Sequence, residues 1–171
     1  MRGTAKTAIK PTESLGDGPL DFRCNSMQIK TKPNRTVCRD DVVVRRGNLL
    51  VCCNVFEGYA TNDWGWERFV CIDEVRAQRG DETMWADKAA FDVETSALVL
   101  TGRPRLHRGK SILEGKRIVI DVENDRARIE QPRGRLESIK SNVLHGVSHS
   151  QELPLEGKLP DTCPLPPAPA R

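Results

Sequence analysis

An Arg-Gly pair recurs at the centre of a repeated unit and limits this chain to few architectures. Three segments of equal length align without gaps, and each carries Arg-Gly at its seventh and eighth positions. These segments are 40–59, 73–92 and 102–121, with Arg-Gly at 46–47, 79–80 and 108–109. A half-unit begins at Gly18, and a decayed unit contains Arg133-Gly134. Because one unit repeats along the chain, the pattern inside it decides the architecture.

Within each unit, apolar residues stand two positions apart, with charged residues between them. This spacing is typical of a strand that buries one face. Gly47, Gly80 and Gly109 supply the positive φ that a tight turn often needs. After the turn, the buried parity holds at the fourth and sixth residues and is inverted at the ninth and eleventh. Since a shift of one residue exchanges the two faces of a strand, a bulge or corner is expected in between.

These patterns predict an all-β fold, with two sheets enclosing one elongated core. Segment 61–67 (TNDWGWE) is expected to be a long hairpin loop between strands at 55–60 and 67–72. A further strand is expected at 97–101, where Leu98 and Leu100 share one face. No window shows the 3.6-residue apolar period of a helix over more than about one turn.

The length of 171 residues predicts one domain with two tails. These parts are a flexible N-terminal segment at 1–19, a β domain at 20–136 and a weakly ordered C-terminal tail at 137–171. Residues 1–19 lack the apolar run of a secretory signal, so none is expected in the chain as it stands. Six of the eleven prolines lie between Pro154 and Arg171, which predicts an extended, disordered tail without strands. A ligand for an SH3-like partner is the alternative interpretation of this tail.

Charge and motifs exclude several classes of protein. Lys+Arg 27 against Asp+Glu 24 gives a net charge of +3, which is too balanced to indicate a nucleic-acid partner. No stretch approaches the roughly 18 apolar residues of a membrane helix. No nucleotide-binding glycine motif is present, and no cofactor is predicted. The acidic pairs Asp40-Asp41 and Asp73-Glu74 are interpreted as solvated turns at strand starts. No catalytic residue is predicted, so the chain is not expected to be an enzyme.

The histidines give no strong signal for a metal. His107 occupies an outward-facing repeat position, where a solvated side chain is expected. His145 and His149 have the H-x3-H spacing of some zinc sites, but Cys163 is their one nearby third ligand. The sequence therefore predicts no metal site.

The six cysteines include no C-x2-C pair, which argues against zinc ribbons and thioredoxin-like redox motifs. Most are interpreted as small core hydrophobes. Cys24 and Cys53 occupy equivalent inward positions in consecutive units, so a cross-strand disulfide between them is conceivable in an oxidising compartment. The adjacent Cys52 and Cys53 are expected to be split between the two faces of a strand.

Several segments resemble the LptA/OstA-like family of lipopolysaccharide-transport proteins. They are LVLTGRPRL at 98–106, WADKAAFDVETSALVLTG at 85–102, ILEGKRIVIDVENDRARIE at 112–130 and DDVVVRRGNLLVCCNVFEGY at 40–59. The resemblance covers about residues 20–131 and depends on a distributed pattern. It implies an open, twisted β-jellyroll in the periplasm.

The resemblance further implies a non-enzymatic bridge that carries lipopolysaccharide toward the outer membrane. Its partners would be LptC-like and LptD-like transport components and further copies of itself, stacked head to tail. Lipid A acyl chains would lie between the two sheets, while sugars and phosphates face water. The inward-facing residues expected to line this slot are Val42, Val44, Val51, Phe56, Val75, Met84, Phe91, Leu100, Leu106, Leu113, Ile118 and Ile120.

Other interpretations remain open at this level. The same inward row also fits an ordinary closed core. A β-repeat scaffold that assembles edge to edge without lipid is the alternative function. Trp64 and Trp66 flank Gly65 in the long loop and either form a partner or membrane-surface contact or fold back over the sheet edge.

Overall fold

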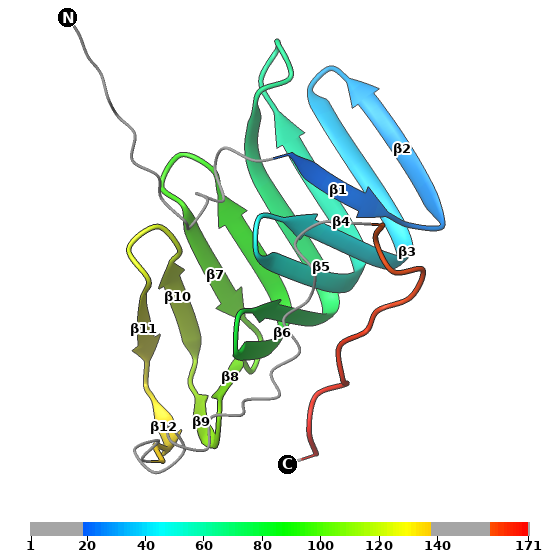
Figure 1. The fold of residues 1–171 in the computed structure, drawn as a ribbon. Coiled ribbons are helices and arrows are strands. Elements are labelled where there is room, and N and C mark those ends of the chain that lie inside the picture. Colours follow the sequence, from blue (N-terminus) through cyan, green and yellow to red (C-terminus); the bar gives the residue numbers. More distant parts are fainter. Residues whose placement is uncertain (1–18, 138–157, 171) are drawn as a thin grey trace, which may run out of the picture.

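The computed structural model describes residues 19–137 and 158–170, and twelve strands make up its secondary structure (Figure 1). The strands are β1 (Leu20–Arg23), β2 (Ser26–Thr31), β3 (Asn34–Arg46), β4 (Leu49–Ala60), β5 (Trp66–Arg79), β6 (Glu82–Asp92), β7 (Ala97–Thr101), β8 (Arg105–Arg108), β9 (Ser111–Glu114), β10 (Arg117–Asp121), β11 (Arg126–Glu130) and β12 (Arg133–Arg135). They pair antiparallel in the order β1-β3-β4-β5-β6-β7-β10-β11, with β2 on β3, β8 between β6 and β9, and β12 on β9. The predicted all-β fold is confirmed.

The long strands bend in their middle, at the place where the buried parity inverts. The register shifts between Arg39 and Val42 in β3 and between Ile72 and Val75 in β5. Each shift contains two acidic residues with positive φ, at 40–41 and at 73–74. Across these shifts the partner residues move from Cys53 to Val55 in β4 and from Ala86 to Lys88 in β6, within the intervals where the parity inverts. The predicted corner is therefore confirmed. The acidic pairs lie inside bent strands, however, and not at strand starts, because β3 and β5 continue through the corner.

The bends divide the sheet into two half-sheets that face each other. The first half-sheet contains β1, β8, β9, β12 and segments 42–46, 49–53, 75–79 and 82–86. The second contains β2, β7, β10, β11 and segments 34–39, 55–60, 66–72 and 88–92. Within the described residues β1 and β11 end the strand order, so the sheet is open rather than closed into a barrel.

Glycines make the tight parts of this path possible. Gly47, Gly80 and Gly109 have φ of 58°, 59° and 61° in the hairpin turns, as predicted from the repeat. Gly115 lies at the corner between β9 and β10, where a Cβ atom would stand 2.5 Å from Ile129 Cγ2 and 2.7 Å from the Glu130 carbonyl oxygen. A larger residue at 115 would push β11 away from this corner.

The core lies between the two half-sheets. Eleven of the twelve predicted inward residues belong to one buried cluster, and Leu113 packs against that cluster while partly buried. Leu100 in β7 and Ile118 in β10 are 0% exposed and are among the most deeply buried residues of this core. The periodicity thus identifies the face of each strand correctly.

The C-terminal segment 158–170 lies against the outer face of the first half-sheet and is called the strap below. A disulfide joins Cys163 of the strap to Cys52 of β4, while Cys24 and Cys53 are free thiols. The Cys24–Cys53 disulfide that the repeat made conceivable is therefore not formed. The strap forms no strand, and Figure 1 shows it in red as an extended segment. His145 and His149 lie outside the described residues.

Candidate functional site

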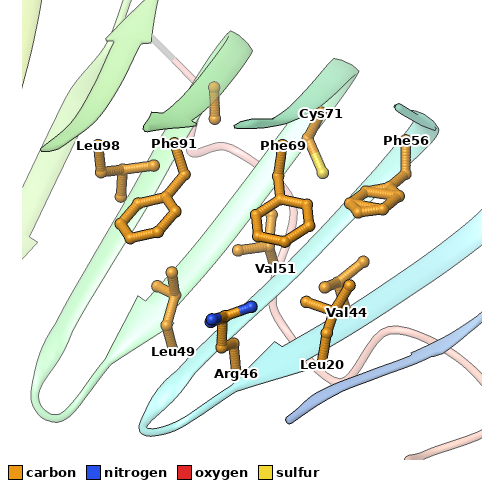
Figure 2. A pocket seen from close by; sticks show the side chains of 11 residues that line it. Leu20, Val44, Arg46, Leu49, Val51, Phe56, Phe69, Cys71, Phe91 and Leu98 are labelled. Atoms are coloured by element: carbon orange, nitrogen blue, oxygen red, sulfur yellow. The ribbon is translucent and has the colours of Figure 1, made fainter. Parts of the chain in front are cut away.

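An apolar pocket opens between the half-sheets, on the side opposite the corners. The first half-sheet supplies one lip and the second supplies the other, as Figure 2 shows. The lining residues are Leu20, Val44, Arg46, Leu49, Val51, Phe56, Phe69, Cys71, Ala89, Phe91 and Leu98. The enclosed space is about 50 Å³. Pockets that bury a small-molecule ligand usually measure about 300–1,000 Å³, so this one must widen to admit such a ligand.

Three phenylalanines form a row across neighbouring strands on one wall of the pocket (Figure 2). The ring centroids of Phe56 and Phe69 are 5.8 Å apart, and those of Phe69 and Phe91 are 6.4 Å apart. Both pairs are stacked, at 21° and 13° between ring planes. The row arises because Phe69 in β5 pairs directly with Phe91 in β6 and diagonally with Phe56 in β4. It gives the pocket a flat apolar wall.

Trp66 extends this wall toward the long loop. Its ring centroid is 5.2 Å from that of Phe69, and it covers Gly58, where a Cβ atom would lie 2.8 Å from Trp66 Cζ3. Trp66 thus folds back over the inner face of the sheet, as one of the two interpretations expected. Trp64 is 41% exposed at the loop tip.

Arg46 places a charge on the opposite lip. Its guanidinium lies 5.4 Å from the centroid of the Phe69 ring, across the pocket, and the residue is 8% exposed. A cation over an aromatic face is favourable, which helps to hold this side chain among apolar groups. The repeat identifies Arg46 as a turn residue, and its place in the pocket was missed. Arg46 lies two residues after Val44 in the same strand and so has the same inward parity, which is the signal that could have revealed it.

Four predicted inward residues, Val44, Val51, Phe56 and Phe91, line the pocket. The other eight belong to or pack against the same core without lining it: Val42, Val75, Met84, Leu100, Leu106, Leu113, Ile118 and Ile120. Besides Arg46, the sequence-based row omits Leu20, Leu49, Phe69, Cys71, Ala89 and Leu98. Phe69 lies in a strand that follows the long loop, outside the aligned repeats, so the alignment could not identify it.

Free thiols gather inside the core near the corners. Cys38, Cys53 and Cys71 are buried, and Cys24 is half-buried. Burial, followed by a hydrogen bond with Cys24, raises the pKa of Cys38 to about 12. A hydrogen bond with Cys53, followed by burial, raises the pKa of Cys71 well above its usual value. Cys38 and Cys71 therefore stay protonated at neutral pH. All four free cysteines lie in or against the core and act as small hydrophobes, as predicted.

Residues 19–137 and 158–170 contain no group of three or more His, Cys, Asp or Glu side chains that could hold a metal ion. Within the same part of the chain, no helix is long and apolar enough to cross a membrane. The arrangement offers an apolar pocket with one cation at its lip. A lining of this kind can bury an apolar group of a ligand.

Comparison with known proteins agrees with this description. The family model of the LptA/(LptD N-terminal domain) LPS transport protein matches residues 23–126. Among solved structures, the chain is similar to LptH, the LptA-homologous periplasmic component of the conserved lipopolysaccharide transport device of Pseudomonas aeruginosa. The TM-score is 0.67 at 14% sequence identity, covering 74% of this chain and 100% of LptH. No curated protein matches the sequence.

The structural similarity to LptH confirms the expected open β-jellyroll. The family match covers more than half of the chain and most of residues 20–131, the segment that resembles this family in sequence. The family consists of non-enzymatic transport proteins, in agreement with the prediction that the chain is not an enzyme. We conclude that the chain belongs to the LptA/LptD N-terminal domain family of lipopolysaccharide-transport proteins.

Proposed function

We propose that this protein is a periplasmic carrier that holds the acyl chains of lipopolysaccharide between its two half-sheets and passes the lipid along a transport bridge. The observation that carries the proposal is the apolar pocket between the half-sheets, walled by the phenylalanine row. Each buried methylene of an acyl chain contributes about 0.8 kcal/mol. The phenylalanine row has no polar group that would fix the acyl chain in one position. An acyl chain can therefore slide, as transfer requires.

The free space of about 50 Å³ means that binding must be coupled to opening of the pocket. The lips come from different half-sheets, connected through the corners at 40–41 and 73–74. A small change in the angle at the corners would separate Leu49 from Phe91 and lengthen the slot along the core. The residues beyond the pocket, including Met84, Leu106 and Ile118, would then become its continuation.

Arg46 supports an amphipathic ligand with negative charge. Its guanidinium lies at the lip, beside apolar walls that extend inward. An acyl chain inside the slot would bring the phosphates of lipid A to the same lip, where a guanidinium recognises them well.

The Cys52–Cys163 disulfide supports a periplasmic location, because structural disulfides persist in oxidising compartments. LptC-like and LptD-like components are the proposed partners, together with further copies of the chain. The outer edges of β1 and β2 support such stacking, since edge strands invite another strand. Phe22, Met27 and Ile29 on these strands are 41%, 42% and 58% exposed.

Photocrosslinking to lipopolysaccharide tests the carrier. A photoreactive phenylalanine analogue replaces Phe91, which lines the pocket, and in a control it replaces Lys88, which is exposed in the same strand. We expect crosslinks at 91 and none at 88. Crosslinks at both or neither position, in folded protein, would contradict a lipid slot. Concentration-dependent filaments in lipid-free buffer, together with no crosslink, would instead support the β-repeat scaffold.

A further inference from the structure

The strap is bound to the sheet by contacts that extend well beyond its disulfide. Arg76 in β5 donates a hydrogen bond from Nη1 to the Leu165 carbonyl oxygen, at 3.0 Å. The Trp85 indole Nε1–H in β6 donates to the Pro166 carbonyl oxygen, also at 3.0 Å. Arg105 in β8 donates from Nη1 to the Pro169 carbonyl oxygen, at 2.9 Å. Three strands, β5, β6 and β8, therefore each supply one hydrogen-bond donor to the strap.

The sequence of the strap restricts its conformation before it binds. Every residue from Cys163 to Pro169 is a proline or directly precedes one. Proline fixes its own φ near −65°, and the residue before a proline is driven to extended or polyproline II conformations. Such a segment loses little backbone entropy when it is bound, and its prolines have no N–H groups. Carbonyl oxygens are thus its main hydrogen-bonding groups, and the sheet offers donors to match them.

Leu165 is the buried apolar side chain that anchors the strap, and Leu159 packs against the same cluster while partly buried. Leu165 is 5% exposed and packs with Val43, Leu50 and Cys52 on the outer face of the first half-sheet. Val43 and Leu50 are 0% and 4% exposed, so the strap covers an apolar patch that would otherwise face water. The neighbouring prolines remain exposed. Their contribution is to hold the backbone extended, while Leu165 and the carbonyl oxygens make the contacts.

Two of the side chains that bind the strap, Trp85 and Arg105, are themselves held in place by other residues. The Trp85 ring packs edge-on against His107 at 4.8 Å between centroids. Arg105 is 6% exposed, and its Nε lies 3.8 Å from Glu114 Oε1. An aromatic donor between two guanidiniums, on a rigid sheet, is an arrangement that suits an extended proline-rich peptide. The inner-face pocket does not use any of these groups.

We infer that the outer face of the first half-sheet is a recognition site for a proline-rich peptide in an extended, polyproline II conformation. Its ligand is the chain's own segment 163–169. Arg76, Trp85 and Arg105 bind the carbonyl oxygens of this ligand, and the patch formed by Val43 and Leu50 binds Leu165. The disulfide retains the ligand, but the site recognises it without a covalent bond.

The test removes the covalent bond from the full-length chain by the double substitution Cys52→Ser and Cys163→Ser. The readout is the NMR signal of the Trp85 indole N–H, assigned with Trp85→Phe. In the double variant this signal is expected to keep the chemical shift and slow hydrogen exchange of the wild type. Adding Leu165→Ala should move it to the position of a solvent-exposed indole. Adding Pro164→Ala, at an exposed ring, should have a smaller effect.

Binding in trans completes the test. A synthetic peptide of residues 160–171 with serine at 163 is titrated into the triple variant that carries Leu165→Ala. The peptide should restore the bound Trp85 signal, and a peptide that also carries Leu165→Ala should bind about tenfold or more weakly. A solvent-exposed Trp85 signal in the double variant, with other signals still dispersed, would show that the disulfide alone holds the strap.

If the double variant does not fold, the disulfide is kept and Leu165→Ala alone is introduced. An unchanged Trp85 signal would then overturn the site, whereas an exposed indole in a still-tethered strap would support it. Lipid crosslinking at position 91 should be unchanged in either outcome, because the strap and the pocket lie on opposite faces of the first half-sheet. The proposed carrier function and this site can therefore fail separately.

Discussion

Cys52 and Cys53 are adjacent in β4 and belong to two different structures, one on each face of the sheet. Cys52 points outward and is bonded to Cys163 of the strap, while Cys53 points inward and packs in the core. The alternation of side chains along a strand makes this separation inevitable. It leaves one cysteine for a covalent link and keeps the other reduced inside.

Removing the disulfide should lower the free energy of unfolding. Cys52 and Cys163 are 111 residues apart, so their bond closes a long loop, for which the chain-entropy model predicts about 4–5 kcal/mol. Measured losses for native disulfides are about 2–5 kcal/mol, and we expect Cys163→Ser to fall in that range. Urea unfolding under oxidising conditions measures the difference. Cys24→Ser, which removes a free thiol, is the control and should cost less. Equal losses for the two variants would contradict a stabilising role of the disulfide.

The repeat predicted the fold well because its physical cause is local. Val51 and Phe56 have opposite parity in the sequence and the same face in the structure, which is possible only if the strand is bent between them. The Arg-Gly turns were equally clear, since Gly47 adopts the positive φ that the pattern required. The bend and the turn both depend on residues that are close in the sequence, so one sequence is enough to predict them.

The strap leaves no periodic signal, and for Arg46 the periodicity gives the face of the strand but not the partner of the side chain. Leu165 is the buried leucine of the strap, and nothing near it in the sequence indicates Val43 or Leu50 as its partners. Arg46 repeats as part of a turn, yet its guanidinium reaches Phe69 across the pocket because the two half-sheets face each other there. The assignment of Cys163 to Cys52 likewise required the path of the strap.

Gly115 should tolerate alanine worse than Gly109 does. At Gly115 a Cβ atom would clash with Ile129 and the Glu130 carbonyl, whereas at Gly109 it would meet nothing within 4 Å. Gly109→Ala should lower the free energy of unfolding by about 1 kcal/mol, because alanine disfavours the φ of 61° at this position. Gly115 has no positive φ, but an alanine there must displace Ile129 and β11, so Gly115→Ala should cost about 1–3 kcal/mol, as overpacking does. Thermal unfolding of the two variants measures the order, and a larger loss for Gly109→Ala would contradict the tight corner.

His107 should make the fold less stable in mild acid. Burial, and then the charge of Arg105, lower its pKa, against an opposing effect of Glu114. The unfolded chain therefore binds a proton first as the pH falls through about 6.5, and the folded state loses stability below that pH. The carboxyl groups of Asp63 and Asp121 have pKa values lowered from 3.8. Their protonation therefore affects stability only at a lower pH than that of His107. His107→Gln should reduce the fall in melting temperature between about pH 7.5 and pH 5.5. An identical fall in the variant would contradict this role.

Arg46→Gln should weaken the binding of phosphorylated lipid more than that of the same lipid without phosphates. Glutamine is shorter than arginine and uncharged, so the apolar walls of the pocket are unchanged while the attraction for a phosphate is lost. A hydrogen bond to a charged group is worth about 1.5–3 kcal/mol, which corresponds to a loss of about tenfold to a hundredfold in affinity. Arg46→Lys keeps the charge without the planar fork and should lie between the two. Calorimetric titration with lipid A and with its dephosphorylated form separates the effects. Equal losses for both lipids would mean that Arg46 supports the lip through its packing on Phe69 and does not read the headgroup.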